Sequence, residues 1–129
     1  MDVSLRKDAD AIISASLRAV LPDKAVRRAL QTFQPRGGRV VLVAAGKAAW
    51  QMARAAVETL GRVDSGVVIT KYGHVKGALP GVTCCEAGHP VPDANGFAAT
   101  EQALAVVRGL TAADTVLFLL SGGGSALFE

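Results

Sequence analysis

The stretch from Arg39 to Ala45 contains a run of strand length that is apolar without alternation. A strand with one face in water alternates polar and apolar side chains, whereas a strand covered on both faces does not. This stretch is therefore predicted to form a central strand of a parallel sheet. The stretch from Thr115 to Leu120 is also apolar after its first residue and is predicted to be another buried strand.

Segments with helical periodicity alternate with these strand-length runs, and glycines mark most of the junctions. Strands are predicted over residues 39–45, 66–70, 82–86 and 115–120, and helices over residues 2–21, 22–33, 46–60 and 93–108. Helices between strands imply parallel crossovers. The expected fold class is α/β, a doubly wound, mainly parallel sheet with helices on both faces, preceded by a helical segment over residues 1–35.

The predicted helices differ in the side chains they offer to a core. In the helix over residues 2–21 the larger apolar residues lie near one face, which makes it amphipathic. The expected inner face of the helix over residues 46–60 consists of Ala49, Met52, Ala53, Ala56, Val57 and Leu60. In the helix over residues 93–108 the residues available for packing are Phe97, Ala98, Ala103, Leu104 and Val107.

The glycine-rich segment after the last predicted strand stops within a few residues, at Glu129. A buried strand of a doubly wound sheet is normally followed by a helix that covers it. We therefore expect the natural chain to continue past Glu129, so that the fold seen here is truncated before its last elements. An apolar sheet surface left uncovered in this way favours self-association.

Composition and charge exclude several classes of protein. The net charge is +3, but basic and acidic residues are scattered and aromatic residues make up only 5%, so a nucleic-acid-binding stripe is not indicated. No apolar run approaches the roughly 18 residues of a membrane span. The N-terminal stretch contains Asp2, Asp8 and Asp10 and does not fit a secretory signal. We expect a cytosolic protein, with Cys84 and Cys85 as small apolar residues on a strand.

The segment from Ser121 to Ser125, with Gly122, Gly123 and Gly124 between the two serines, is the strongest candidate for a ligand site. In open α/β sheets ligands bind at the carboxyl ends of the strands, where this loop lies. Glycines let backbone amides approach an anion, and serine hydroxyls suit phosphate or carboxylate oxygens. The pattern indicates anion binding, and the alternative is a loose glycine turn.

Lys47 follows Gly46 at the first strand-to-helix turn. A lysine in the first turn of a helix is unfavourable next to the helix dipole unless an anion joins it, which indicates a bound phosphate. The surrounding residues do not form a Walker A loop, because Ala48 stands where Ser or Thr would hold magnesium. A solvated surface lysine is the alternative.

Other polar residues follow the second and third predicted strands and are possible contacts in the same cleft: Lys71, His74, His89 and Asp93. Asp93 is also placed to cap the helix that follows it. No carboxylate or histidine lies at a spacing that would clamp a metal with either histidine, so no metal site is predicted. No strand is followed by the Gly-x-Gly-x-x-Gly motif of a dinucleotide-binding site. A nucleophile elbow would need glycine two residues after Ser125, where this chain has Leu127.

Four ordered blocks of the chain resemble the glycerate 2-kinase family, whose second domain is called MOFRL and some of whose members have been labelled hydroxypyruvate reductases. The blocks are Val-Ala-Ala-Gly-Lys-Ala-Ala-Trp-Gln-Met-Ala (43–53), Thr-Lys-Tyr-Gly-His (70–74), Glu-Ala-Gly-His-Pro-Val-Pro-Asp (86–93) and Leu-Leu-Ser-Gly-Gly-Gly-Ser-Ala-Leu (119–127). The resemblance covers essentially the whole chain. It implies that residues 1–129 are the N-terminal part of a Rossmann-like domain, without the MOFRL domain.

The resemblance also implies an activity, the phosphorylation of D-glycerate to 2-phosphoglycerate with ATP and Mg²⁺. The lysine matching Lys47 is then a catalytic candidate, and the loop matching residues 121–125 holds substrate or phosphate groups. This chain alone is expected to be inactive. The alternatives are an NAD(P)H-dependent hydroxypyruvate reductase and a non-catalytic domain that binds a small molecule or anion.

Overall fold

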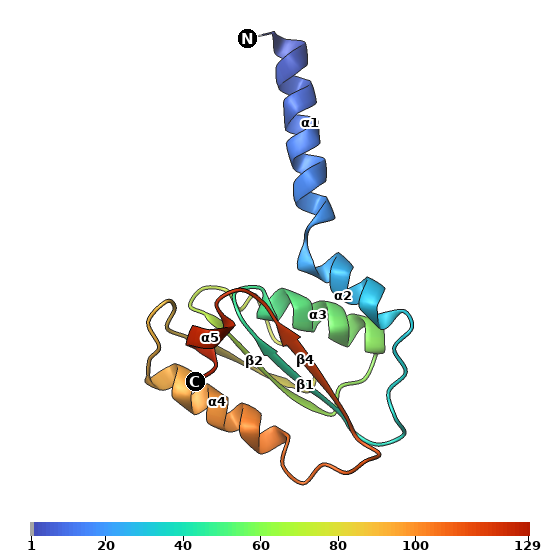
Figure 1. Ribbon diagram of the computed structural model, residues 1–129, viewed down its shortest axis with the longest axis vertical. Helices are drawn as coiled ribbons and strands as arrows, with labels where there is room; N and C mark the ends of the chain where they lie inside the picture. The colour runs from blue at the N-terminus through green and yellow to red at the C-terminus, as the bar shows by residue number, and fades with distance from the viewer. Residues whose placement is uncertain (1) are drawn as a thin grey trace.

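The computed structural model describes residues 2–129 as one four-stranded parallel sheet with helices on both faces (Figure 1). The strands are β1 (Val40–Ala45), β2 (Ser65–Lys71), β3 (Val82–Ala87) and β4 (Thr115–Leu120). The helices are α1 (Val3–Ala19), α2 (Pro22–Leu30), α3 (Ala49–Leu60), α4 (Ala94–Val106) and α5 (Gly124–Leu127). The predicted α/β class and the predicted order of elements are confirmed.

Strand β1 lies at the centre of the sheet, where its sequence placed it. All six of its residues are buried. The strand order is β3-β2-β1-β4, so β1 pairs with β2 on one side and with β4 on the other. In the register, Ala45 lies between Ile69 of β2 and Leu120 of β4, so these strands end together at one edge of the sheet.

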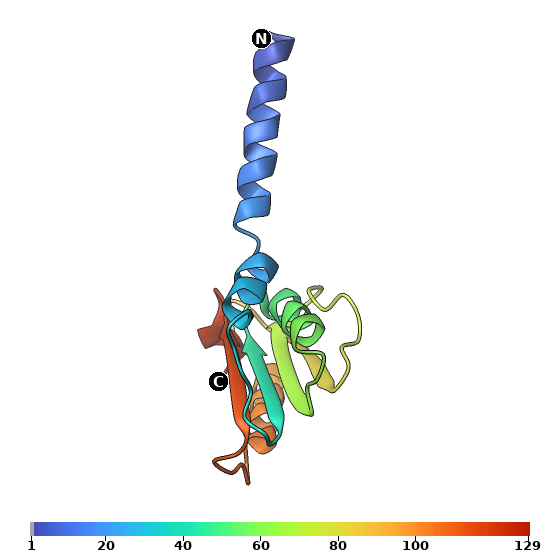
Figure 2. The ribbon, with the colours of Figure 1, turned by 90° about the vertical axis from the view of Figure 1, so that its right-hand side faces the viewer.

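Helices α2 and α3 cover one face of the sheet, while α4 and α5 cover the other (Figures 1 and 2). Ala49, Ala53 and Ala56 recur along one side of α3 and are all fully buried. Their small side chains let the helix axis approach the sheet closely. Helix α3 ends at Gly61, which adopts a left-handed conformation with φ of 67°. The three alanines confirm half of the predicted inner face, and the other three predicted residues, Met52, Val57 and Leu60, are half-buried.

The predicted packing face of α4 is partly wrong. Ala103 is buried, but Phe97 and Leu104 are 48% and 47% exposed. The buried side instead carries Gly96, Ala99 and Thr100 together with Ala103. This stripe of small residues lets α4 lie close to β2 and β3. The larger side chains of Phe97 and Leu104, which the helical periodicity favoured for packing, therefore point away from the sheet.

Strand β4 is an edge strand, not a strand covered on both faces as its sequence indicated. Val116, Phe118 and Leu120 are 45%, 49% and 59% exposed. They lie on the face of the sheet that carries α4, because Phe118 pairs with Val43 of that core. Helix α4 contacts β2 and β3 and does not extend over β4, which leaves this row of side chains open.

Helix α1 extends away from the sheet in both views (Figures 1 and 2). Asp2 caps it, because its carboxylate accepts a hydrogen bond of 2.8 Å from the amide of Ser4. The predicted helix is confirmed, but none of its residues is buried. None of the helices in residues 2–129 is both long enough and apolar enough to cross a membrane.

The carboxylate of Asp114 joins the start of β1 to the turn that precedes β4. One oxygen accepts a hydrogen bond of 2.7 Å from the amide of Arg39, and the other accepts one of 2.8 Å from the amide of Thr111. The Arg39 guanidinium lies 3.3 Å from the second oxygen. The two amides and this guanidinium lower the pKa of Asp114 to about 2.

The low pKa of Asp114 predicts how stability depends on pH. An ordinary Asp titrates at about pH 3.9. The contribution of Asp114 to the free energy of unfolding is therefore present above about pH 4 and is lost as pH falls through about 2. Urea unfolding across this range should show the wild type losing more of its free energy of unfolding than Asp114→Asn. Asp8→Asn, which removes a carboxylate from exposed α1, is the control and should follow the wild type. Equal acid sensitivity of wild type and Asp114→Asn would contradict the prediction.

Candidate functional site

The strand order creates one natural ligand site at the carboxyl edge of the sheet, between β1 and β4. From β1 the chain proceeds outward through β2 to β3, and it then returns to place β4 on the other side of β1. Open α/β sheets bind ligands outside the carboxyl ends of the strands at such a switch point. Lys47 follows β1, and the segment from Ser121 to Gly124 follows β4. The two strongest predicted features therefore meet at the switch point.

Hydrogen bonds join the two loops directly. The amide of Lys47 donates to the carbonyl of Gly122 at 2.8 Å, and the amide of Ala48 donates to the hydroxyl oxygen of Ser121 at 3.0 Å. Gly46 has φ of 123°, and a Cβ at this position would collide with the Ser121 hydroxyl. Only glycine allows the loops to approach this closely. We call this contact, made by Gly46, Lys47, Ala48, Ser121 and Gly122, the β1–β4 loop junction.

The residues of the predicted glycine-rich loop differ in which of their polar groups are already hydrogen-bonded. The Ser121 hydroxyl already accepts from Ala48, whereas Ser125 is exposed in α5. Within residues 2–129 the amides of Gly122 and Gly123 donate no hydrogen bond. The Lys47 side chain lies over these two glycines: a Cβ on Gly122 would be 3.8 Å from Lys47 Cε. Two open amides and an ammonium-bearing side chain thus share one small region.

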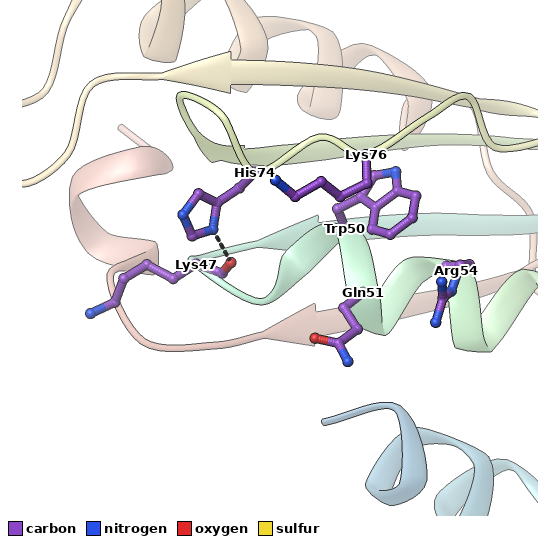
Figure 3. Close-up of a pocket in the computed structure, with 6 residues that line it drawn as sticks. All are labelled: Lys47, Trp50, Gln51, Arg54, His74 and Lys76. Carbon is purple, nitrogen blue, oxygen red and sulfur yellow. Dashed lines mark hydrogen bonds between the residues drawn. The ribbon is translucent and has the colours of Figure 1, made fainter. Parts of the chain in front are cut away.

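Both histidines lie beside this region. A Cβ on Gly123, which has φ of 85°, would meet the His89 ring at Nε2, 2.6 Å away. His74 places Nδ1 3.1 Å from the carbonyl oxygen of Lys47, as the dashed line in Figure 3 marks. Because a carbonyl oxygen only accepts, His74 must carry its proton on Nδ1 in this contact. The loops after β2 and β3 therefore bring His74 beside Lys47 and His89 beside Gly123.

Asp93 holds the rim of the site. Its carboxylate caps α4 by accepting a hydrogen bond of 3.1 Å from the amide of Gly96, which confirms the predicted cap. It also accepts a hydrogen bond from the hydroxyl of Tyr72, which in turn accepts from Asn95. The Tyr72 hydroxyl is the main cause of a lowered pKa at Asp93, and this carboxylate in turn raises the pKa of Tyr72. Asp93 is therefore a charged structural group at the rim.

Lys71 ends β2 and is half-buried, at the same edge of the sheet. Within residues 2–129 its side chain makes no hydrogen bond or ion pair. Sequence reasoning missed Tyr72, the one tyrosine of the chain, although its position directly after β2 marked it as a candidate for this edge.

Sequence reasoning also missed a pocket beside Lys47. The pocket has a volume of about 230 Å³ and lies between α3 and the loop that links β2 to β3 (Figure 3). It is lined by Lys47, Trp50, Gln51, Arg54, His74 and Lys76. The available signal was the spacing of Lys47, Gln51 and Arg54, which share one side of the helix predicted over residues 46–60. In the structure α3 begins at Ala49, so Lys47 lies in the turn before the helix and not in its first turn as predicted. The apolar periodicity of α3 predicted its inner face and carries no information about ligands on its outer face.

The described residues do not offer a cluster of acidic or histidine ligands. Within residues 2–129 no three His, Cys, Asp or Glu side chains come close enough together to hold a metal ion. Cys84 and Cys85 lie in β3 as free thiols, and burial raises the pKa of both.

Known proteins share both the sequence and the fold of this chain. A D-glycerate 2-kinase from Thermotoga maritima is 53% identical over 127 residues, an alignment covering 98% of this chain and 30% of that protein. The crystal structure of a glycerate kinase from Thermotoga maritima matches with a TM-score of 0.90 and 51% identity, over 98% of this chain and 30% of that one. A protein from Agrobacterium vitis named as a hydroxypyruvate reductase is 43% identical, over 98% of this chain and 28% of that protein.

This chain thus spans about 30% of the length of the first two relatives. Residues 8–129 match a family described as Domain of unknown function (DUF4147). The match includes β1 to β4, the β1–β4 loop junction and both histidines, and the fold agrees with that of a glycerate kinase. Relatives from Thermotoga maritima and Pyrococcus horikoshii are named glycerate 2-kinases, and the chain belongs to the DUF4147 family.

Proposed function

We propose that this chain supplies the phosphoryl-binding side of the active site of a glycerate 2-kinase, which transfers phosphate from ATP to the 2-hydroxyl of D-glycerate. The observation that carries the proposal is the position of the Lys47 side chain over Gly122 and Gly123, whose amides are open. The kinase names of the relatives support the same reaction. The small-molecule acceptor and ATP follow from those names and from the resemblance described above.

The chemistry of phosphoryl transfer fits the groups at this site. The oxygen of the substrate hydroxyl forms a bond to the terminal phosphorus, the bond from that phosphorus to the ADP oxygen breaks, and the hydroxyl proton leaves. An enzyme promotes this step mainly by positioning the reactants and by stabilising charge on the transferred group. The ammonium of Lys47 and the amides of Gly122 and Gly123 are donors of the kind that bind those oxygens. We propose His89, which lies beside Gly123, as the group that receives the hydroxyl proton.

Magnesium is implied by the resemblance, but residues 2–129 do not present a fitting set of ligands. The two carboxylates at this edge of the sheet already accept hydrogen bonds: Glu86 from the amide of Val75, and Asp93 from Tyr72 and Gly96. Mg²⁺ prefers an octahedron of oxygens that it shares with substrate phosphates and water. The roles proposed for Lys47 and the glycine loop therefore do not depend on a metal ligand from this part of the chain.

A reductase is the second candidate function, because one relative carries the name hydroxypyruvate reductase. In a dinucleotide-binding fold the first strand-to-helix turn leaves its amides free for the pyrophosphate. Here the amides of Lys47 and Ala48 are already bound to Gly122 and Ser121. The site therefore favours the kinase. A full-length enzyme that oxidises NADH with hydroxypyruvate, and consumes no ATP with D-glycerate, would reverse this choice.

We propose the cytoplasm, where both kinase substrates are available, as the place of action.

Replacing Lys47 tests its proposed role. In a full-length enzyme that contains this chain, Lys47→Ala should lower kcat by about 10²- to 10³-fold, the effect of removing one electrostatic donor to a transition state. The fold should persist, since the contact with Gly122 uses the backbone of residue 47. Lys24→Ala, at an exposed position of α2, is the matched control and should retain activity. Normal turnover by folded Lys47→Ala would show that Lys47 is a surface lysine without a catalytic role.

The 129-residue chain alone should not phosphorylate D-glycerate. Holding two substrates in reacting geometry contributes roughly 7 to 11 kcal/mol to such a reaction, and one side of a cleft cannot supply most of it. Incubation with ATP, Mg²⁺ and D-glycerate, followed by an assay for 2-phosphoglycerate, measures this directly. Product that forms with the wild-type chain but not with Lys47→Ala would mean that these residues are catalytically sufficient.

The same isolated chain should self-associate through the open face of β4. Val116, Phe118 and Leu120 form a row of exposed apolar side chains there. Contiguous apolar surface of this kind is rare on monomeric proteins. Sedimentation velocity at increasing protein concentration should show a growing average mass, and Phe118→Asp should reduce the growth. A mass that stays monomeric throughout would refute the expectation.

A further inference from the structure

The pocket between α3 and the β2–β3 loop is lined by basic side chains, and no acidic side chain lines it. Its lining includes Lys47, Arg54 and Lys76, together with His74, and it includes no carboxylate. Within residues 2–129, neither Lys47 nor Lys76 forms an ion pair. Like charges gathered in a concave site repel one another, and an anion bound among them removes the cost.

Arg54 has an incomplete set of partners. Its guanidinium lies over the ring of Trp50, 5.3 Å from the centroid, and its Nε is 3.7 Å from a carboxylate oxygen of Glu58. This Nε is buried and donates no hydrogen bond within residues 2–129. The contact with the Trp50 ring helps to position the guanidinium, which is a fork of donors suited to phosphate oxygens.

The β2–β3 loop, which forms the wall of the pocket opposite α3, is held in place by hydrogen bonds within the protein. The Trp50 indole donates a hydrogen bond of 2.9 Å to the carbonyl of Gly77, and the Lys76 ammonium donates one of 2.7 Å to the carbonyl of Gly73. In Figure 3 the Lys76 side chain runs toward His74. An ammonium has three donors, so Lys76 retains donors for a ligand while its position is set.

The arrangement of the charges calls for an elongated anion. Lys47 and Arg54 lie at opposite ends of the pocket, with Lys76 and His74 between them on the loop side (Figure 3). Lys47 precedes α3 and Arg54 lies within it, and their side chains point to opposite ends of the pocket, so a single phosphate does not contact both. The Lys47 end adjoins the open amides of Gly122 and Gly123. A chain of phosphates lying along α3 would therefore end where the proposed transfer takes place.

We propose that this pocket binds the polyphosphate chain of a nucleoside triphosphate, with Lys76 and Arg54 as binding residues and the terminal phosphate directed to Lys47. The inference rests on the proposed kinase function for the identity of the ligand. Because the pocket recognises phosphates and not the base, ATP, GTP and inorganic tripolyphosphate should bind with similar affinity. ADP should bind more weakly, and AMP weakest.

Trp50 makes the test direct, because it is the only tryptophan of the chain and lines the pocket. Tripolyphosphate and ATP, without metal, are titrated into the 129-residue chain while Trp50 emission and ligand ³¹P line widths are recorded. Both signals should saturate, and the affinity should fall as salt is raised. Circular dichroism establishes that each protein is folded.

Lys76→Ala should weaken tripolyphosphate binding by about tenfold, and Lys76→Glu by more, as expected for losing one charge-assisted contact. Arg54→Gln, read by ³¹P line width because it alters the surroundings of Trp50, should do the same. Lys24→Ala removes equal charge outside the pocket and should change binding less than twofold. Saturable binding that survives Lys76→Glu, or absence of binding to folded wild type in both signals, would overturn the inference.

The outcome can be separated from that of the proposed kinase function. Tripolyphosphate binding lost in Lys76→Glu, in a full-length enzyme that does not phosphorylate D-glycerate, would support the pocket and refute the kinase. A full-length Lys76→Glu enzyme that keeps its D-glycerate kinase activity and its KM for ATP would refute the pocket and support the kinase.

Discussion

The pairing of β1 with β4, continued by the loops beyond them, is the contact on which the site depends. Strand pairing brings Ala45 and Leu120 to one level, and two further hydrogen bonds join Lys47 and Ala48 to Gly122 and Ser121. The turn that leads into α3 is thereby held by two residues far along the chain. Because the glycine loop is fixed to the helix in this way, the position of Lys47 relative to Gly122 and Gly123 is set by the sheet itself.

Small residues recur wherever two parts of the molecule approach closely. Alanines line the buried side of α3, Gly96 and Ala99 line that of α4, and Gly46 permits the loop junction. The close approach of the two loops has a chemical consequence at the carboxyl edge of the sheet. The backbone amides of Gly122 and Gly123 donate no hydrogen bond within residues 2–129, so the charge on Lys47 lies beside donors that are free to bind an anion.

Much of this could be predicted from the sequence, and the failures have physical reasons. The unbroken apolar run of β1 predicted its central position, and the glycines after the strands indicated candidate ligand loops at the carboxyl edge of the sheet. The equally apolar β4 is an edge strand, because composition reports how apolar a strand is but not which elements cover it. Phe97 and Leu104 were expected to pack, but the stripe of small residues on α4 faces the sheet instead. The basic pocket depends on a loop folding back over α3, as the bond from Trp50 to Gly77 shows, and such a contact leaves no local signal in the sequence.

Helix α1 has a consequence for how this molecule responds to heat. Its 17 residues form a rod about 25 Å long with no buried side chain. Helices of this length are marginal in water when nothing packs against them, because nucleation is costly and each turn adds little. The helix–coil equilibrium of α1 is thus set by its own sequence, by the Asp2 cap and by any surface that meets its apolar side. On warming, α1 will melt gradually from its ends, while the sheet and its covering helices unfold together at a higher temperature.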